Sequence, residues 1–98
     1  MNDRGDYMVF FFCRVYDDMY YTGCKIRLYQ DRLSISLFVK KWVIPYEAIT
    51  KLHYKRRIMG IEYVSKMGEY YIEILAMNNK KLKHALSNAC IPIITYTQ

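Results

Sequence analysis

The sequence lacks any long run of apolar residues. Its longest uninterrupted run covers six positions, residues 8–13, whereas a membrane-spanning helix needs about twenty. The opening residues MNDRGD carry two acids against one base, and no small-residue cleavage site follows an adequate apolar stretch. This pattern argues against a signal peptide. We therefore expect a cytoplasmic protein without a transmembrane helix.

Residues that carry chemistry are also scarce. The three cysteines, Cys13, Cys24 and Cys90, do not show the C-x-x-C spacing of a zinc or redox site. An odd number of thiols fits a reducing compartment, so we expect reduced and partly buried cysteines. The two histidines, His53 and His84, have no cysteine or carboxylate at a spacing that suggests a catalytic triad. We expect both histidines to be solvated.

Glycine-rich and acidic motifs are missing as well. The four glycines stand alone at positions 5, 23, 60 and 68, so no phosphate-binding loop is present. Asp17 and Asp18 are adjacent, and neighbouring strand residues point to opposite faces, so this pair indicates a turn rather than an acid–base or cation site. We expect no catalytic residue, no metal and no cofactor, and we predict that the protein is not an enzyme.

The composition is that of one globular domain over residues 1–98. Hydrophobic residues make up 53% and charged residues 24% of the chain, far from the balance that keeps chains disordered. A chain of this length buries roughly two-thirds of the surface that its unfolded form exposes, which allows one modest core. No linker, internal repeat or low-complexity segment divides the sequence.

Positive charge is concentrated in the middle of the chain. The net charge is +6, and residues 21–60 carry nine bases and two acids, whereas residues 1–20 carry two bases and four acids. A field of this sign favours phosphate-bearing partners such as nucleic acid, nucleotides or an anionic membrane. The alternative is that solvent-facing lysine and arginine only keep the protein soluble.

Apolar and polar residues alternate through most of the sequence, which indicates antiparallel strands with one buried face. The stretch YMVFFFCRVYDDMYYTG predicts a first strand and a turn near Asp17 and Asp18. Gly23 is expected at the entry to the next strand. In CKIRLYQDRLSISLF, two strands meet at Gln30 and Asp31. The next turn is expected around Lys40 and Lys41.

Residues 40–57, KKWVIPYEAITKLHYKRR, predict a short strand, a corner and a second strand. Pro45 ends the first strand, because proline cannot donate a ladder hydrogen bond. In the corner we expect Ile44 and Ile49 to be buried and Tyr46 and Glu47 to lie on the rim. The second strand resumes the alternation, with Leu52, Tyr54 and Ile58 facing the core and Lys51, His53, Lys55 and Arg57 facing solvent.

The last third of the chain predicts two more strands and one helix. Gly60 is expected to separate the preceding strand from IEYVS, and the turn KMG leads into the strand EYYIEILAM. Asn78 or Asn79 is expected to cap the helix N-terminus with its side chain. The apolar positions of the helix fall at helical spacing and are Leu82, Ala85, Leu86 and Ala89.

Three stretches, KIRLYQDRLSI, VIPYEAITKL and YYIEILAMNNKKLKHAL, make residues 25–89 resemble the pleckstrin-homology-like (PH-like) superfamily, in particular small bacterial PH-like and GRAM-like domains. The resemblance implies a mainly β (α+β) fold, a barrel of about seven antiparallel strands in two near-orthogonal sheets capped by one C-terminal α-helix. It also implies a non-catalytic binding module. The first hairpin, RVYDDMYYTGCKIR, has an acidic pair where lipid-binding members carry a basic cluster.

Our first functional hypothesis is protein–protein interaction through exposed aromatic residues among the eleven tyrosines and Trp42, because such rings bury a large area at low entropy cost. The alternative is that half or more of these rings fill the core. A lone domain of this kind could be a complex subunit or a small inhibitor, and the Lys-, Asn-, Ile- and Tyr-rich composition fits a bacterial or phage accessory protein from an AT-rich genome.

The second hypothesis is binding or sequestration of an anionic ligand, such as a nucleotide, a phosphoinositide or an anionic membrane. The third is binding of single-stranded nucleic acid, although no RRM-type aromatic-glycine signature is present. Homo-oligomerisation is a further possibility, because the hydrophobic strand YMVFFFCRVY must be either central to the core or an interface. The candidate residues for partner or ligand binding are Lys40, Lys41, Trp42, Lys55, Arg56 and Arg57.

Overall fold

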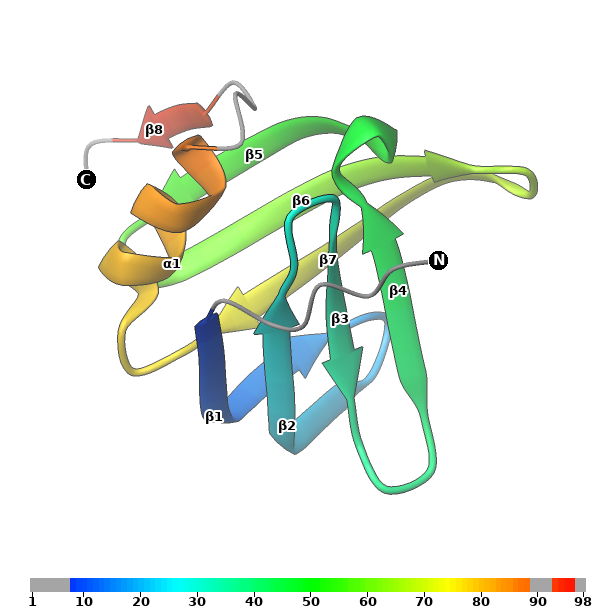
Figure 1. Cartoon of the computed structure of the whole chain (residues 1–98), viewed down its shortest axis with the longest axis vertical. Coiled ribbons are helices and arrows are strands. Elements are labelled where there is room, and N and C mark those ends of the chain that lie inside the picture. Colours follow the sequence, from blue (N-terminus) through cyan, green and yellow to red (C-terminus); the bar gives the residue numbers. More distant parts are fainter. Residues whose placement is uncertain (1–7, 89–92, 97–98) are drawn as a thin grey trace.

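The computed structural model describes residues 8–88 and 93–96. Its strands are β1 (Met8–Tyr16), β2 (Tyr20–Leu28), β3 (Arg32–Ser36), β4 (Lys41–Pro45), β5 (Ile49–Lys55), β6 (Ile58–Ser65), β7 (Gly68–Leu75) and β8 (Ile93–Tyr96). A 3-10 turn, η1 (Tyr46–Ala48), joins β4 to β5, and the helix α1 (Asn79–Ser87) follows β7. The predicted mainly β architecture with seven antiparallel strands and a C-terminal helix is confirmed (Figure 1).

The strands form a single hydrogen-bonded sheet rather than the two near-orthogonal sheets that the resemblance implied. Its order is β4-β3-β2-β1-β7-β6-β5-β8, and β8 runs parallel to β5 while all other neighbours are antiparallel. β8 was not predicted, since the sequence pattern ended the fold with the helix. The hydrophobic strand β1 lies inside the sheet, paired with β2 on one side and, over residues 14–16, with β7 on the other.

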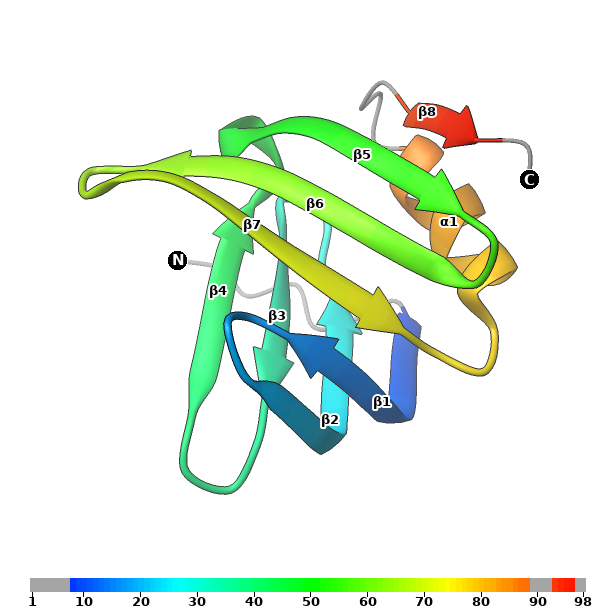
Figure 2. The ribbon, with the colours of Figure 1, turned by 180° about the vertical axis from the view of Figure 1, so that it is seen from behind.

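The sheet changes direction because β1 and β2 each turn a corner (Figures 1 and 2). At this bend Phe12 has a φ of 57° and Gly23 a φ of 73°, and Cys13 pairs with Cys24 between two shifts of register in β1. Glycine adopts positive φ at little steric cost. Gly23 therefore bends β2 from within, and its predicted position at the strand entry is wrong, because β2 already begins at Tyr20.

The core contains the inward-facing side chains of both halves of the sheet and the apolar face of α1. The largest fully buried side chains are Ile26, Leu28, Leu33, Ile35, Ile44, Leu52, Met59, Ile61, Ile72, Ile74, Leu82 and Leu86. The alternation predicted the buried face of β2 and β3 correctly, since a strand that buries one face repeats every second residue. In β5, Leu52 is buried as predicted, whereas Tyr54 is half-buried. Ala85 is also buried as predicted, whereas Ala89 lies outside the described residues.

The structure confirms some of the turns that the sequence predicted and corrects the positions of others. The turns at Gln30–Asp31 and Lys66–Met67 are confirmed, and Pro45 is the last residue of β4. The turn expected at Lys40 and Lys41 has its tip earlier, at residues 38–39, because Lys41 already pairs with Ser36. In the corner, Tyr46 is buried rather than on the rim, because its hydroxyl donates a 2.7 Å hydrogen bond to the Tyr29 carbonyl.

Gly60 lies inside β6 and does not separate two strands. The ring of Tyr71 on the neighbouring strand covers it, and a Cβ added at Gly60 would lie 2.8 Å from ring atoms Cε1 and Cζ of Tyr71. Gly60 is therefore needed for a close approach of a side chain rather than for a turn. A strand glycine can serve either purpose, and the sequence pattern does not distinguish them.

The helix begins without the predicted side-chain cap. Asn78 occupies the N-cap position but makes no capping hydrogen bond with its side chain. Asn79 is buried, and its amide instead accepts a 2.7 Å hydrogen bond from the Ala76 N–H and donates one of 3.2 Å to the Ile74 carbonyl. Asn79 thus joins α1 to the end of β7. Among the described residues, no helix has the length and apolar content that a membrane span requires.

Candidate functional site

The six candidate residues lie at two separate places. Lys40, Lys41 and Trp42 belong to the β3–β4 hairpin, whereas Lys55 and the pair Arg56–Arg57 form the β5–β6 turn. β4 and β5 are far apart in the strand order, and Figures 1 and 2 show the two hairpin ends at different ends of the molecule. The central positive charge of the sequence therefore does not form one basic patch.

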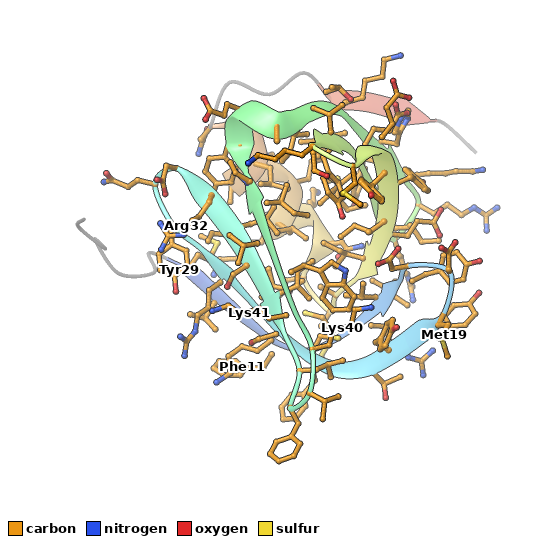
Figure 3. All side chains as sticks on the ribbon, turned by 90° about the vertical axis from the view of Figure 1, so that its right-hand side faces the viewer. Phe11, Met19, Tyr29, Arg32, Lys40 and Lys41 are labelled. Carbon is orange, nitrogen blue, oxygen red and sulfur yellow. The ribbon has the colours of Figure 1, made fainter. Side chains whose placement is uncertain are left out.

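The β3–β4 hairpin uses two of its candidates to hold its own structure. Trp42 is buried, and its indole N–H donates a 2.9 Å hydrogen bond to Oδ2 of Asp17. Lys40 Nζ lies 5.0 Å from the centroid of the Trp42 ring and donates a 3.3 Å hydrogen bond to the Tyr21 hydroxyl. Lys41 is exposed, and Figure 3 shows it on the opposite side of the hairpin from Lys40.

The tip of this hairpin carries apolar residues that the sequence analysis did not single out. Phe38 is 100% exposed, and Val39 is largely exposed too. Phe11, from β1, is also exposed and lies toward the same end of the molecule as Lys41 (Figure 3), with Lys25 Nζ 5.3 Å from its ring centroid. The sequence does contain a signal for this exposed tip, because the apolar pair Phe38–Val39 stands between a predicted strand and the basic pair Lys40–Lys41.

At the β5–β6 turn the structure differs in part from the prediction of which residues between 52 and 58 face the core and which face solvent. Leu52 is buried and Lys55 exposed, as predicted. Arg57 lies in the turn rather than on a strand face, and Ile58 is 37% exposed instead of in the core. The reason is that the chain reverses at residues 56–57, so Ile58 pairs with Lys55 and shares its outer face.

The outer face of β5, β6 and β7 holds a polar network that sequence spacing did not reveal. His53 Nε2 lies 2.5 Å from Oε2 of Glu62, so the prediction of a solvated His53 is wrong, whereas His84 is exposed as predicted. The Tyr71 hydroxyl donates a 2.8 Å hydrogen bond to Glu73. Tyr71 and Glu73 lie two positions apart on β7, whereas His53 and Glu62 meet only through the pairing of β5 with β6, whose register places Lys51 beside Glu62.

A groove of about 600 Å³ crosses this outer face. Lys55 and Arg56 line it together with the carboxylates of Glu62 and Glu73. Charges of both signs lie within the groove, so they cancel much of the field that an anion would experience. This groove does not favour the anionic ligand that the basic sequence suggested.

A second groove, of about 630 Å³, lies where the β1 bend, the β5–β6 turn and the start of α1 meet. We call it the bend groove and define it by Phe12, Arg14, Tyr54, Arg57, Met77 and Lys80. Three of these side chains are cations, and none of the described residues that line the groove carries a carboxylate. Arg57 is the one sequence candidate here, and it joins two cations that the sequence analysis missed.

The two cysteines that the structure describes lie in the core and not at these surfaces. Cys13 and Cys24 are free and fully buried, and burial together with the neighbouring Cys24 raises the pKa of Cys13 to about 11. Cys90 lies outside the described residues. Within the described ranges, no group of three or more His, Cys, Asp or Glu side chains is placed to hold a metal ion.

The tyrosines and Trp42 serve both the core and the surface, and Trp42 is buried. Tyr46 is buried, but Tyr16, Tyr20, Tyr70 and Tyr71 are exposed. Tyr21, Tyr54 and Tyr63 are half-buried and pack against the core, so the described tyrosines divide between the surface and the core.

No model of a known protein family matches the chain. No curated protein sequence matches it.

Proposed function

We propose that the protein is a non-catalytic binding module with a PH-like fold that recognises another protein, as a complex subunit or a small inhibitor. The fold proposal is supported by the order of seven antiparallel strands and one helix. It is also supported by the bend in β1 and β2, which turns β3–β4 away from β5–β7 and curls the sheet toward a barrel (Figures 1 and 2).

The observation that carries the recognition proposal is the state of Phe12. Its side chain is 82% exposed, and its backbone has a φ of 57°. Leaving a large apolar side chain in water forgoes about 1.5–3 kcal/mol of burial, and the left-handed conformation costs about 1–2 kcal/mol for an L-residue. Residues held in such conformations cluster at binding sites, where the surrounding structure imposes the strain.

The surroundings of Phe12 also favour a protein partner. A single exposed apolar residue is normal on a protein surface, but Phe12 lines the bend groove together with Met77, which is also exposed. Apolar side chains next to exposed cations form a surface that a partner protein can cover with apolar and acidic groups of its own. The Phe38 tip provides a second exposed apolar anchor at another end of the molecule.

The test is native mass spectrometry of the tagged protein recovered gently from its own host. We expect the wild type to retain a protein partner at fixed stoichiometry and Phe12→Asn to lose it at an unchanged melting temperature, because asparagine tolerates the left-handed conformation. The matched control is Met67→Ser, which removes another exposed apolar side chain outside the bend groove. A partner retained equally by all three proteins would contradict the role of Phe12.

Binding of an anionic ligand is the second candidate function. It is favoured by the three cations of the bend groove, which no lining carboxylate offsets among the described residues. In the same spectra, a bound phosphate-bearing small molecule without any protein partner would favour this function over the first. Binding of single-stranded nucleic acid stays the third candidate, and a retained oligonucleotide would favour it.

A further inference from the structure

We propose that the bend groove binds an acidic segment of the partner protein that also carries an apolar side chain. The carboxylates of the segment pair with Arg14, Arg57 and Lys80, and its apolar side chain packs on Phe12 and Met77. This inference rests on the proposed protein-binding function and names the chemistry of the partner.

The charge of the groove selects an anionic partner. Arg14, Arg57 and Lys80 are all exposed, and none of them lies within ion-pair distance of a carboxylate in the described part of the chain. Lys83 adds a fourth cation at the wall, because its Nζ lies 4.7 Å from the centroid of the Tyr54 ring. An arginine side chain offers a planar fork that matches the two oxygens of a carboxylate.

The apolar side chains exclude a simple inorganic anion as the best ligand. Phe12 is 82% and Met77 91% exposed, and both line the same groove as the cations. A free phosphate would leave both side chains in water. A segment with an apolar side chain beside its carboxylates removes this surface from water, and the flexible thioether of methionine adapts to different side chains.

The shape and the aromatic residues of the groove favour a peptide over a nucleic acid. The site is a half-open volume of about 630 Å³ between three chain segments, which an extended segment can enter. Single-stranded nucleic acids are bound by stacking bases on aromatic faces. Tyr54 is half-buried, and Lys83 covers a face of its ring, which leaves Phe12 as the open ring of the groove. One open ring does not provide the successive stacking platforms that a single strand uses.

Fluorescence anisotropy with synthetic peptides tests the inference on the full chain. The probe is a short labelled peptide that alternates glutamate with leucine. One comparison peptide has glutamine at every glutamate, and another has serine at every leucine. We expect the glutamate–leucine peptide to bind more tightly than both, and its affinity to fall with added salt, because exposed charge pairs are screened.

The decisive comparison uses two triple variants that lose the same net charge. The triple variant Arg14→Gln, Arg57→Gln and Lys80→Gln should bind the glutamate–leucine peptide about tenfold or more weakly than the wild type does. Even one lost charge-assisted hydrogen bond is worth that factor in affinity. Lys41→Gln with Lys51→Gln and Lys66→Gln removes three exposed cations outside the bend groove and should leave the affinity unchanged. Thermal unfolding of both variants confirms that each is folded.

Several outcomes overturn the inference. These are equal affinity for the glutamine peptide, an equal loss in both triple variants, or tighter binding of phosphatidylserine vesicles or of an oligothymidine strand that depends on the same three cations. If the host partner is retained by the groove variant in native mass spectra, only this inference fails. If the wild type retains no partner at all, the proposed function itself fails.

Discussion

Trp42 donates its indole N–H to the carboxylate of Asp17 over 2.9 Å, across 25 positions of sequence. The bond ties the edge strand β4 to the turn between β1 and β2. The edge-to-face contact of Trp42 with Tyr21, at a centroid distance of 5.2 Å, supports the same junction. Trp42, a candidate for partner binding on sequence grounds, therefore stabilises one end of the bent sheet.

Removing Asp17 should weaken this junction. Asp17→Ala leaves the indole N–H of a buried tryptophan without its acceptor, which we expect to cost about 1–3 kcal/mol of unfolding free energy. For a domain of this size, each kcal/mol lowers the melting temperature by about 4–8 °C. Thermal unfolding followed by the fluorescence of Trp42, the single tryptophan, measures this. Glu69→Ala, at an exposed position on β7, is the control, and equal melting temperatures for the two variants would refute the prediction.

The contact between Gly60 and Tyr71 predicts a strong coupling. Gly60→Ala should destabilise the fold by about 1–3 kcal/mol, because its methyl group would overlap the Tyr71 ring. In a Tyr71→Ala background the ring is absent, so the same substitution should cost much less. A double-mutant cycle in urea measures the coupling free energy. Costs that simply add would show that the ring moves aside freely.

The bend predicts different effects on the free energy of unfolding for substitutions at its two residues with positive φ, Gly23 and Phe12. Gly23→Ala should cost about 1–2 kcal/mol, although no atom stands within 4 Å of the added Cβ, because the cost comes from the positive φ alone. Phe12→Gly should cause no such loss, since it relieves the same strain and removes an exposed side chain. Urea unfolding compares the two, with Thr22→Ala as the control at an exposed neighbouring position.

Burial of Cys13 predicts a loss of stability at alkaline pH. Burial raises the pKa of the Cys13 thiol from 9.0 to about 11, so the folded state holds this proton more tightly than the unfolded state does. The resulting stability is complete below pH 9 and is lost as the pH rises toward 11. Urea midpoints across this range should fall more steeply for the wild type than for Cys13→Ala. Parallel profiles would assign the loss to other groups.

The sequence predicted the faces of the strands better than their interruptions. Ile26, Leu28, Leu33 and Ile35 follow the alternation because burial of one face acts on every second residue of a strand, whatever the strand pairs with. The position of Gly60 was predicted wrongly because the sequence does not distinguish a glycine inside a strand from a glycine in a turn. The Tyr71 ring that covers Gly60 belongs to another strand.

The candidate site was predictable only in part for the same reason. The excess of positive charge in residues 21–60 is visible in the sequence, but the fold separates Lys40 and Lys41 from the β5–β6 turn and places carboxylates beside Lys55 and Arg56. His53 and Glu62 likewise meet through the pairing of β5 with β6. Such neighbours depend on register, which local patterns do not encode.

The sequence by itself determined the mainly β architecture with one helix after the seventh strand, most turns and the buried face of most strands, because these follow from local alternation, proline and helical spacing. The tertiary structure alone decided which charges stay unpaired and meet one another. Arg14, Arg57 and Lys80 line one groove because the bend in β1 and β2 positions β1 beside the β5–β6 turn and the start of α1. That bend depends on a left-handed phenylalanine, which no propensity predicts.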